Sequence, residues 1–299
     1  VFGEVLERCE GDRAAGQRHC NIFLELPKLE LLRRGGHAPA LDRDILRSSM
    51  EHMRAHRDCG DFLAAGYTRI VYRHWDSPLL DDPLRPEIER TFLEFMYWLD
   101  EPGEESACFL SENHQVLYHS AELLAGQRWP EATFADGRPG GWHREHARAM
   151  LDRWLDWRAR FGYSEWASSC YYAEDIAALA NLADFAEDSD IRRRARGLLD
   201  LTLFEMAVNS FDGAFGLSAG RLYPAQVFRP ETAGTSAASW LCWGLGSATV
   251  AVSLAGVTLA ASDYAPPALL ERVALDLPAV AGVPAEELTS LQRHGHRLQ

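Results

Sequence analysis

The sequence predicts an all-α protein, organised as an incomplete (α/α) toroid of antiparallel helical hairpins. Apolar residues recur at helical spacing through the centre of the chain, and strand-like alternation is almost absent. Long loops rich in Gly, Pro, Asp and Trp, such as residues 128–142 and 209–224, separate the helical segments. A bundle, a solenoid and a toroid all stack such hairpins, but long polar loops favour the toroid, where they build a cleft at one end.

The clearest helices are expected at 142–161 and 189–209. In the first, apolar positions recur every three or four residues and Gly162 follows as a stop. Its stripe consists of Trp142, His146, Met150, Trp154, Trp157 and Phe161. In the second, Asp188 or Ser189 is the expected cap, and the apolar face consists of Ile191, Ala195, Leu198, Thr202 and Met206.

Other segments are less regular. Helices are expected from about 173, from 112 and over 85–100, whereas 68–75 fits either a strand or a helix. Residues 86–299 are expected to form the toroid as one continuous domain, with 1–85 contributing preceding helical pairs. The final helix-like stretch, 284–299, has no closing element after it, so both ends of the chain are interpreted as cut from something longer.

The uncharged run 232–262 is long enough to cross a bilayer. Small residues dominate it, while Leu, Ile and Phe are sparse. We therefore expect a helix, or a glycine-broken pair of helices, buried in protein, and no membrane insertion.

Composition excludes one class of partner. The chain has 299 residues and a formal charge of −14, and Lys28 is its only lysine. Such a chain can bury a sizeable core but offers no basic face, so a nucleic acid is not an expected partner.

Six cysteines without a CxxC motif are expected to be free thiols. No charged-then-apolar leader opens the chain, and its compartment and oligomeric state stay open.

Two histidine pairs have metal-compatible spacing. His52 and His56 are four residues apart, but they lack the glutamate of an HExxH motif. His143 and His146 are three residues apart beside Glu145, so they could bind a metal or simply flank the cleft at a helix start. We interpret the first pair as a solvated helical face, and we expect neither a metal nor a cofactor.

The segment "SENH" places three functional groups in one helical turn. If Ser111 caps the helix, then Glu112, Asn113 and His114 lie where unpaired backbone N–H groups and the helix dipole favour an anion. Asn113 can donate to a substrate carboxylate, and His114 can act as acid or base. An ordinary capped helix with His114 packed in a core fits the same spacing.

Two further segments concentrate functional side chains. The segment 158–175, a loop between the helix 142–161 and the helix expected from about 173, is rich in aromatic and ionisable groups, which in a loop favours a function. Three glycines precede Arg221 and Tyr223 and would let the backbone approach a ligand closely. The candidates in the loop are Arg160, Glu165, Trp166, Tyr171 and Tyr172. Each also has a structural interpretation, with tyrosines at a core edge and Arg160 as a helix C-terminal charge.

The order of "SENHQ", "LLAGQ", "WLDWRARFGYSEWASSCYYAEDIAALANLADFAED" and "AGRLY" resembles the helical domains of the heparinase and alginate-lyase group of polysaccharide lyases. The resemblance covers residues 105–225. In the alginate-lyase branch an Asn-His pair opens an inner helix, an Arg follows, and a Tyr comes shortly after it. Asn113-His114, Arg160, and Tyr171 or Tyr172 stand here in that order.

The resemblance implies β-elimination on a uronate-containing poly- or oligosaccharide. Asn113, with Arg160 or Arg221, would neutralise the substrate carboxylate and stabilise the enolate-like state. His114 or a deprotonated tyrosine would remove the C5 proton, and Tyr172 or Tyr171 would protonate the leaving oxygen. Glu112 departs from the family pattern, because it adds a negative charge beside the intended anion site.

Two other functions compete with this one. Toroids also host inverting glycoside hydrolases, which need two carboxyl groups roughly 6.5 to 9.5 Å apart, and Glu112 with Glu165 or Asp175 could supply them. In a non-catalytic carbohydrate-binding or structural domain, the tryptophans and tyrosines would be core and the polar groups would cap helices.

Overall fold

The computed structural model describes residues 22–104, 106–211, 213–246 and 254–275. Within these ranges the chain is predominantly α-helical, which confirms the all-α prediction. The elements in chain order are α2 (Ile22–Arg33), α3 (Arg43–Arg54), α4 (Gly60–Arg73), α5 (Leu84–Glu94), α6 (Glu112–Arg128), α7 (Gly140–Phe161), α8 (Tyr172–Phe185), α9 (Ser189–Asn209), β1 (Ser210–Phe211), β2 (Ala214–Phe215), α10 (Pro224–Phe228), the 3-10 helix η3 (Pro230–Thr232), α11 (Gly234–Trp243), α12 (Leu254–Ala260) and α13 (Ala268–Leu275). The strands β1 and β2 form a short antiparallel hairpin.

The capping and stop residues in the sequence correctly predicted the end of α7 and the start of α9. Helix α7 ends at Phe161 and is followed by Gly162, whose φ of 72° suits a glycine. The Asp188 carboxylate caps α9 by accepting from the N–H groups of Asp190 and Ile191. All five residues of the predicted apolar face of α9 are buried. The segment 68–75 belongs mostly to α4, so its helical interpretation is the correct one.

Helix α5 is shorter than expected. It ends at Glu94, whereas the sequence predicted a helix to residue 100. The backbone N–H groups of Tyr97 and Trp98 both donate to the Glu101 carboxylate, at 3.0 and 3.1 Å. This side chain therefore satisfies backbone groups outside the helix, which allows the chain to leave the helical conformation.

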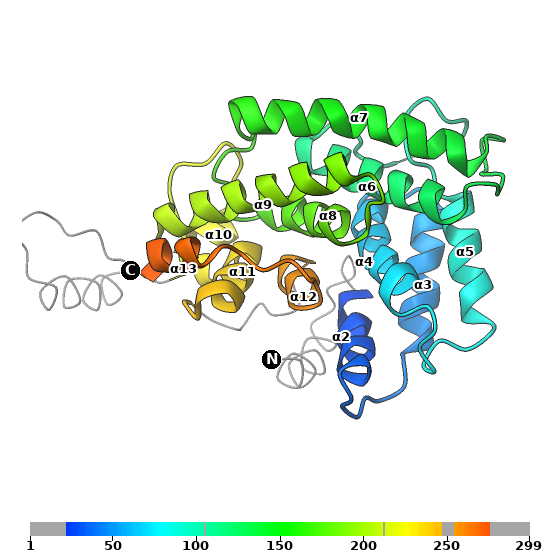
Figure 1. The fold of residues 1–299 in the computed structure, drawn as a ribbon, viewed down its shortest axis with the longest axis horizontal. Coiled ribbons are helices and arrows are strands. Elements are labelled where there is room, and N and C mark those ends of the chain that lie inside the picture. Colours follow the sequence, from blue (N-terminus) through cyan, green and yellow to red (C-terminus); the bar gives the residue numbers. More distant parts are fainter. Residues whose placement is uncertain (1–21, 105, 212, 247–253, 276–299) are drawn as a thin grey trace, which may run out of the picture.

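The predicted stripe of α7 is mostly not a buried face. Of its six residues only Trp154 is buried, while Trp157 and Phe161 are 58% and 71% exposed. Figure 1 shows the reason: α7 lies at the outside of the molecule, along α6. The helix packs through a different line of residues, among them Gly140, His143, Ala147 and Leu151.

In the described parts of the uncharged run, 232–246 and 254–262, the α-helices are α11 and α12. Helix α11 ends at Trp243 and is followed by Gly244, which has a left-handed φ of 70°, and α12 begins at Leu254, as expected for a glycine-broken pair. Residues 247–253 lie outside the described residues, as do 1–21 and the helix-like stretch 284–299. Among the helices of the described ranges, none has the length and apolarity to span a membrane.

Helices α4, α6 and α8 run in the same direction. At their first turns, His114 of α6 contacts Asp61 of α4. At their other ends, the Tyr72 hydroxyl of α4 donates to the Leu124 carbonyl of α6, and Gln127 of α6 donates to the Phe185 carbonyl of α8. The first turns of α4, α6 and α8 therefore face one end of the molecule, which we call the loop end.

Each of these helices has an antiparallel partner. Gly60 at the start of α4 lies beside Met53 near the end of α3, while Tyr67, farther along α4, bonds to Ser49, farther back along α3. Tyr172 at the start of α8 bonds to Glu205 near the end of α9. Helices α6 and α7 pack very closely, because a Cβ at Gly126 would lie 2.4 Å from the Gly140 carbonyl oxygen.

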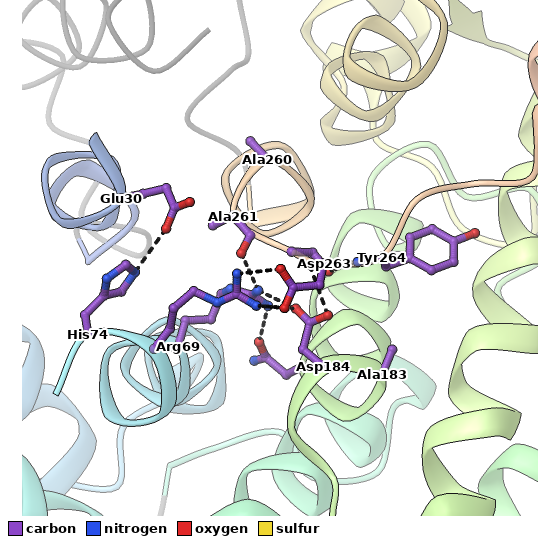
Figure 2. Close-up of polar contacts among 12 residues, drawn as sticks. Glu30, Arg69, His74, Ala183, Asp184, Ala260, Ala261, Asp263 and Tyr264 are labelled. Atoms are coloured by element: carbon purple, nitrogen blue, oxygen red, sulfur yellow. Dashed lines mark hydrogen bonds and ion pairs between the residues drawn. The ribbon is translucent and has the colours of Figure 1, made fainter. Parts of the chain in front are cut away.

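A buried arginine joins three segments at the end opposite the loop end (Figure 2). The Arg69 guanidinium of α4 is shielded from solvent and contacts the Asp184 carboxylate at 2.5 Å and the Asn181 side-chain oxygen at 2.8 Å, both on α8. It also donates to the Ala261 carbonyl, just after α12, at 2.7 Å. A buried guanidinium requires such partners because it has lost its hydration.

We expect Arg69→Met to lower the free energy of unfolding by about 3 kcal/mol, because the buried Asp184 carboxylate loses its closest cation and keeps only the Arg73 guanidinium, at 3.6 Å. Urea unfolding followed by circular dichroism measures the change. Arg193→Gln is the matched control, since the Arg193 side chain is 72% exposed, and its unfolding midpoint should stay close to that of the wild type. Equal midpoints for the two variants would contradict the role assigned to Arg69.

Candidate functional site

Side chains from three separate segments meet at the loop end. The Asn113 amide at the start of α6 donates to one carboxylate oxygen of Glu165 at 2.7 Å. The Arg221 guanidinium donates to the other oxygen at 2.9 Å. A single carboxylate is thus bound by an amide and a guanidinium, which links "SENH", "YSEW" and "GRLY" in space.

Two tyrosines extend this group. The hydroxyl oxygens of Tyr171 and Tyr223 are 2.6 Å apart, and Arg221 donates to the Tyr223 hydroxyl at 2.9 Å. The Arg221 guanidinium also lies over the Tyr171 ring, 4.1 Å from its centroid. Burial, together with the hydrogen bond to Tyr223, raises the pKa of Tyr171. We call Asn113, Glu165, Tyr171, Arg221 and Tyr223 the loop-end cluster.

Glu112 holds the loop that carries Glu165. Its carboxylate accepts the backbone N–H of Ser164 at 2.7 Å and that of Glu165 at 3.3 Å, and it forms an ion pair with Arg158 of α7. The negative charge that departs from the lyase pattern is therefore compensated within the protein. Glu112 positions Glu165 opposite Asn113.

His114 forms a buried pair with an acid of α4. Its Nδ1 atom lies 2.7 Å from the Asp61 carboxylate, and its ring stacks on Phe62. Burial alone would lower the pKa of His114, but the hydrogen bond and the charge of Asp61 outweigh it and raise the pKa. The packed-core interpretation and the acid–base interpretation of His114 are compatible with this environment.

Two carboxyl groups occupy the first turn of α8. Burial raises the pKa of Glu174 to about 8, and the charges of Asp61 and Glu165 act in the same direction. Burial likewise raises the pKa of Asp175, whose carboxylate oxygens have no hydrogen-bond partner among the described residues. Glu174 is therefore largely protonated at neutral pH, whereas Glu165 is ion-paired. The sequence interpretation counted Glu174 among the ionisable groups of this segment but chose Asp175 for the hydrolase pair, because burial at a helix start is not visible in the residue pattern.

Three predicted site residues lie apart from this cluster. Tyr172 is fully buried, donates from its hydroxyl to Glu205 at 2.7 Å and accepts the N–H of Ala167. Arg160 is exposed and pairs with Asp156 at 2.9 Å. Trp166 is 51% exposed, and its carbonyl accepts the Gly220 N–H, which supports the turn before Arg221.

Comparison with known proteins identified no relative of this chain. No family model, curated protein or solved structure matches the chain. The chemistry of the loop end must therefore be inferred from its own geometry.

We expect Glu174→Gln to flatten the dependence of stability on pH. The folded-state pKa of about 8 exceeds the ordinary carboxyl value of 4.5, so between these values the folded state binds more protons than the unfolded state. Stability then falls as pH rises through this window, and the glutamine variant loses that contribution. Urea unfolding at pH 5, 6.5 and 8 measures the slopes. An unchanged slope would show that Glu174 does not titrate as proposed.

Proposed function

We propose that the chain is a carbohydrate-active enzyme that cleaves a uronate-containing glycan by β-elimination at the loop-end cluster. One observation carries the proposal: a guanidinium, a carboxamide and two tyrosine hydroxyls 2.6 Å apart converge from three segments of the chain. Neutralisation of a carboxylate and proton transfer, the two requirements of the reaction, are both available there.

The donors of the cluster suit a planar anion. Arg221 and Asn113 each bind one oxygen of the Glu165 carboxylate, and a substrate carboxylate that displaced Glu165 would meet the same two donors. When the C5 proton leaves, charge moves onto that carboxylate as an enolate-like state. Donors already in position stabilise this charge more than the ground state, which accelerates the reaction.

The two tyrosines supply the proton transfers. Tyr171, whose raised pKa keeps its proton in place, gives that proton to the leaving glycosidic oxygen as the C4–O bond breaks. Tyr223, as a phenolate stabilised by Arg221, takes the C5 proton. The short distance between their hydroxyls lets a proton pass between them and restore the starting state. Tyr171 replaces Tyr172 in this scheme, because Tyr172 is buried against Glu205. His114, oriented by Asp61, is the alternative base.

We also propose that the helices form part of an (α/α) toroid. The shared direction of α4, α6 and α8, each with an antiparallel partner, supports this arrangement. It gives a reason why the polar loops gather beside the first turns of these helices.

An inverting glycoside hydrolase is the second candidate, favoured by one observation. Glu174 has a pKa of about 8, whereas Glu165 is paired with Arg221. Two carboxyl groups whose environments push them toward opposite protonation states are typical of a general acid and a general base. Glu112 suits the acid role less well, since Arg158 and two backbone N–H groups bind its carboxylate.

We expect the purified chain to generate ultraviolet absorbance from a new conjugated double bond when incubated with a panel of uronans. Tyr171→Phe and Tyr223→Phe should each lower turnover by roughly 10²-fold or more, because each removes a hydroxyl that transfers a proton in the reaction. The phenyl ring remains, so the packing of the site should be kept. Asn113→Ala should weaken transition-state stabilisation by about 2.7–4 kcal/mol if it acts as an oxyanion-type donor.

Arg160→Gln and Arg221→Gln form a matched pair, since both remove one arginine charge but only Arg221 belongs to the cluster. Activity should survive the first substitution and fall with the second. Cleavage without the absorbance change, lost in Glu174→Gln, would favour the hydrolase. Elimination undiminished in Asn113→Ala, Tyr171→Phe and Tyr223→Phe would contradict the site assignment.

A further inference from the structure

A second group of functional side chains lies between α6 and α7, more than one helical turn from Asn113. His119 and Glu122 are three residues apart on α6, and His143 and His146 are three apart on α7. The Nδ1 atoms of His119 and His143 each lie 3.1 Å from the Glu122 carboxylate, and that of His146 lies 2.8 Å from it. The Glu122 side chain is completely buried.

We propose that His119, Glu122 and His146 bind a divalent transition metal ion of the Zn²⁺ type. One potential ligand atom from each residue lies within 4.8 Å of those of the other two. Zinc binds nitrogen at about 2.0–2.1 Å and carboxylate oxygen at about 2.0–2.2 Å, so small side-chain movements would bring all three to one ion. Two imidazoles and one carboxylate are a donor set that leaves a fourth position open.

Neighbouring groups orient these ligands. His143 bonds to Glu122 through Nδ1 and to Asp136 through Nε2, both at 3.1 Å. Ligands of metal sites are typically held by such outer hydrogen bonds. Trp142 stacks on the His146 ring with an interplanar angle of 9°, and the Trp98 ring centroid is 4.4 Å from that of His119. These contacts limit the rotation of both imidazole rings.

The surroundings also allow an ion to enter and the imidazoles to ligate. The His146 side chain is 20% exposed, which gives a route from solvent. In the metal-free state Nδ1 of His119 carries the proton that it donates to the Glu122 carboxylate, whereas Nε2 is buried without a hydrogen-bond partner among the described residues and can take up that proton. Nδ1 of His119 can therefore offer its lone pair to a metal. The competing interpretation is a metal-free core network in which three imidazoles donate to one carboxylate.

The test uses the full chain, free of affinity tags, stripped with a chelator and titrated with Zn²⁺ and, separately, with Co²⁺. We expect a stoichiometry of about one ion per chain and the visible absorption of a low-coordinate Co²⁺ site. His146→Gln and Glu122→Gln should lower affinity by at least the roughly 10- to 100-fold known for loss of outer-shell partners. Circular dichroism establishes that each variant is folded, and the partly exposed position of His146 makes its variant the safer one.

Two controls separate this site from other binding. Glu145→Gln removes an exposed carboxylate beside His146 and should leave affinity unchanged. Cys59→Ser alters a different metal-compatible group, formed by Asp58, Cys59 and His114, and should also retain binding. Absence of binding in the wild type, equal affinity in His146→Gln, or loss of binding only in Cys59→Ser would overturn the proposal.

Discussion

The burial of Arg69 is the constraint on which the helix arrangement depends. A guanidinium shielded from water must keep its partners, so α4, α8 and the segment after α12 are held together at one end. Arg69 and Asp61 are eight residues apart on the same helix, or roughly 12 Å along its axis. A contact at one end therefore limits how the first turns of α4 and α8 can shift at the other.

The loop end combines two kinds of polar contact with different purposes. Glu112 and Arg158 form a shielded pair that fixes the loop backbone, while Arg221 remains 40% exposed and can reach a ligand. Glu165 takes part in both, through its backbone N–H and its carboxylate. This division gives the proposed reaction centre a rigid support without hiding its cation from solvent.

The sequence predicted features that depend on neighbouring residues and missed those that depend on packing. The cap at Asp188 and the buried face of α9 follow from local chemistry, and both were predicted correctly. Tyr171 and Tyr172 are adjacent in sequence, so only the exact start and rotation of α8 decide which hydroxyl joins the loop-end cluster. Similarly, the spacing of His143 and His146 was visible, but their contact with Glu122 depends on how α6 and α7 align.

The close approach of Gly126 to Gly140 sets the separation of α6 and α7 for everything built across them. A methyl group at residue 126 would meet backbone atoms of α7, which cannot rotate away as a side chain can. The pair of Glu112 with Arg158 and the contact of Glu122 with His146 both bridge these two helices. The geometry of both contacts therefore depends on the distance between α6 and α7, and a change in that distance would alter the loop-end cluster and the histidine group together.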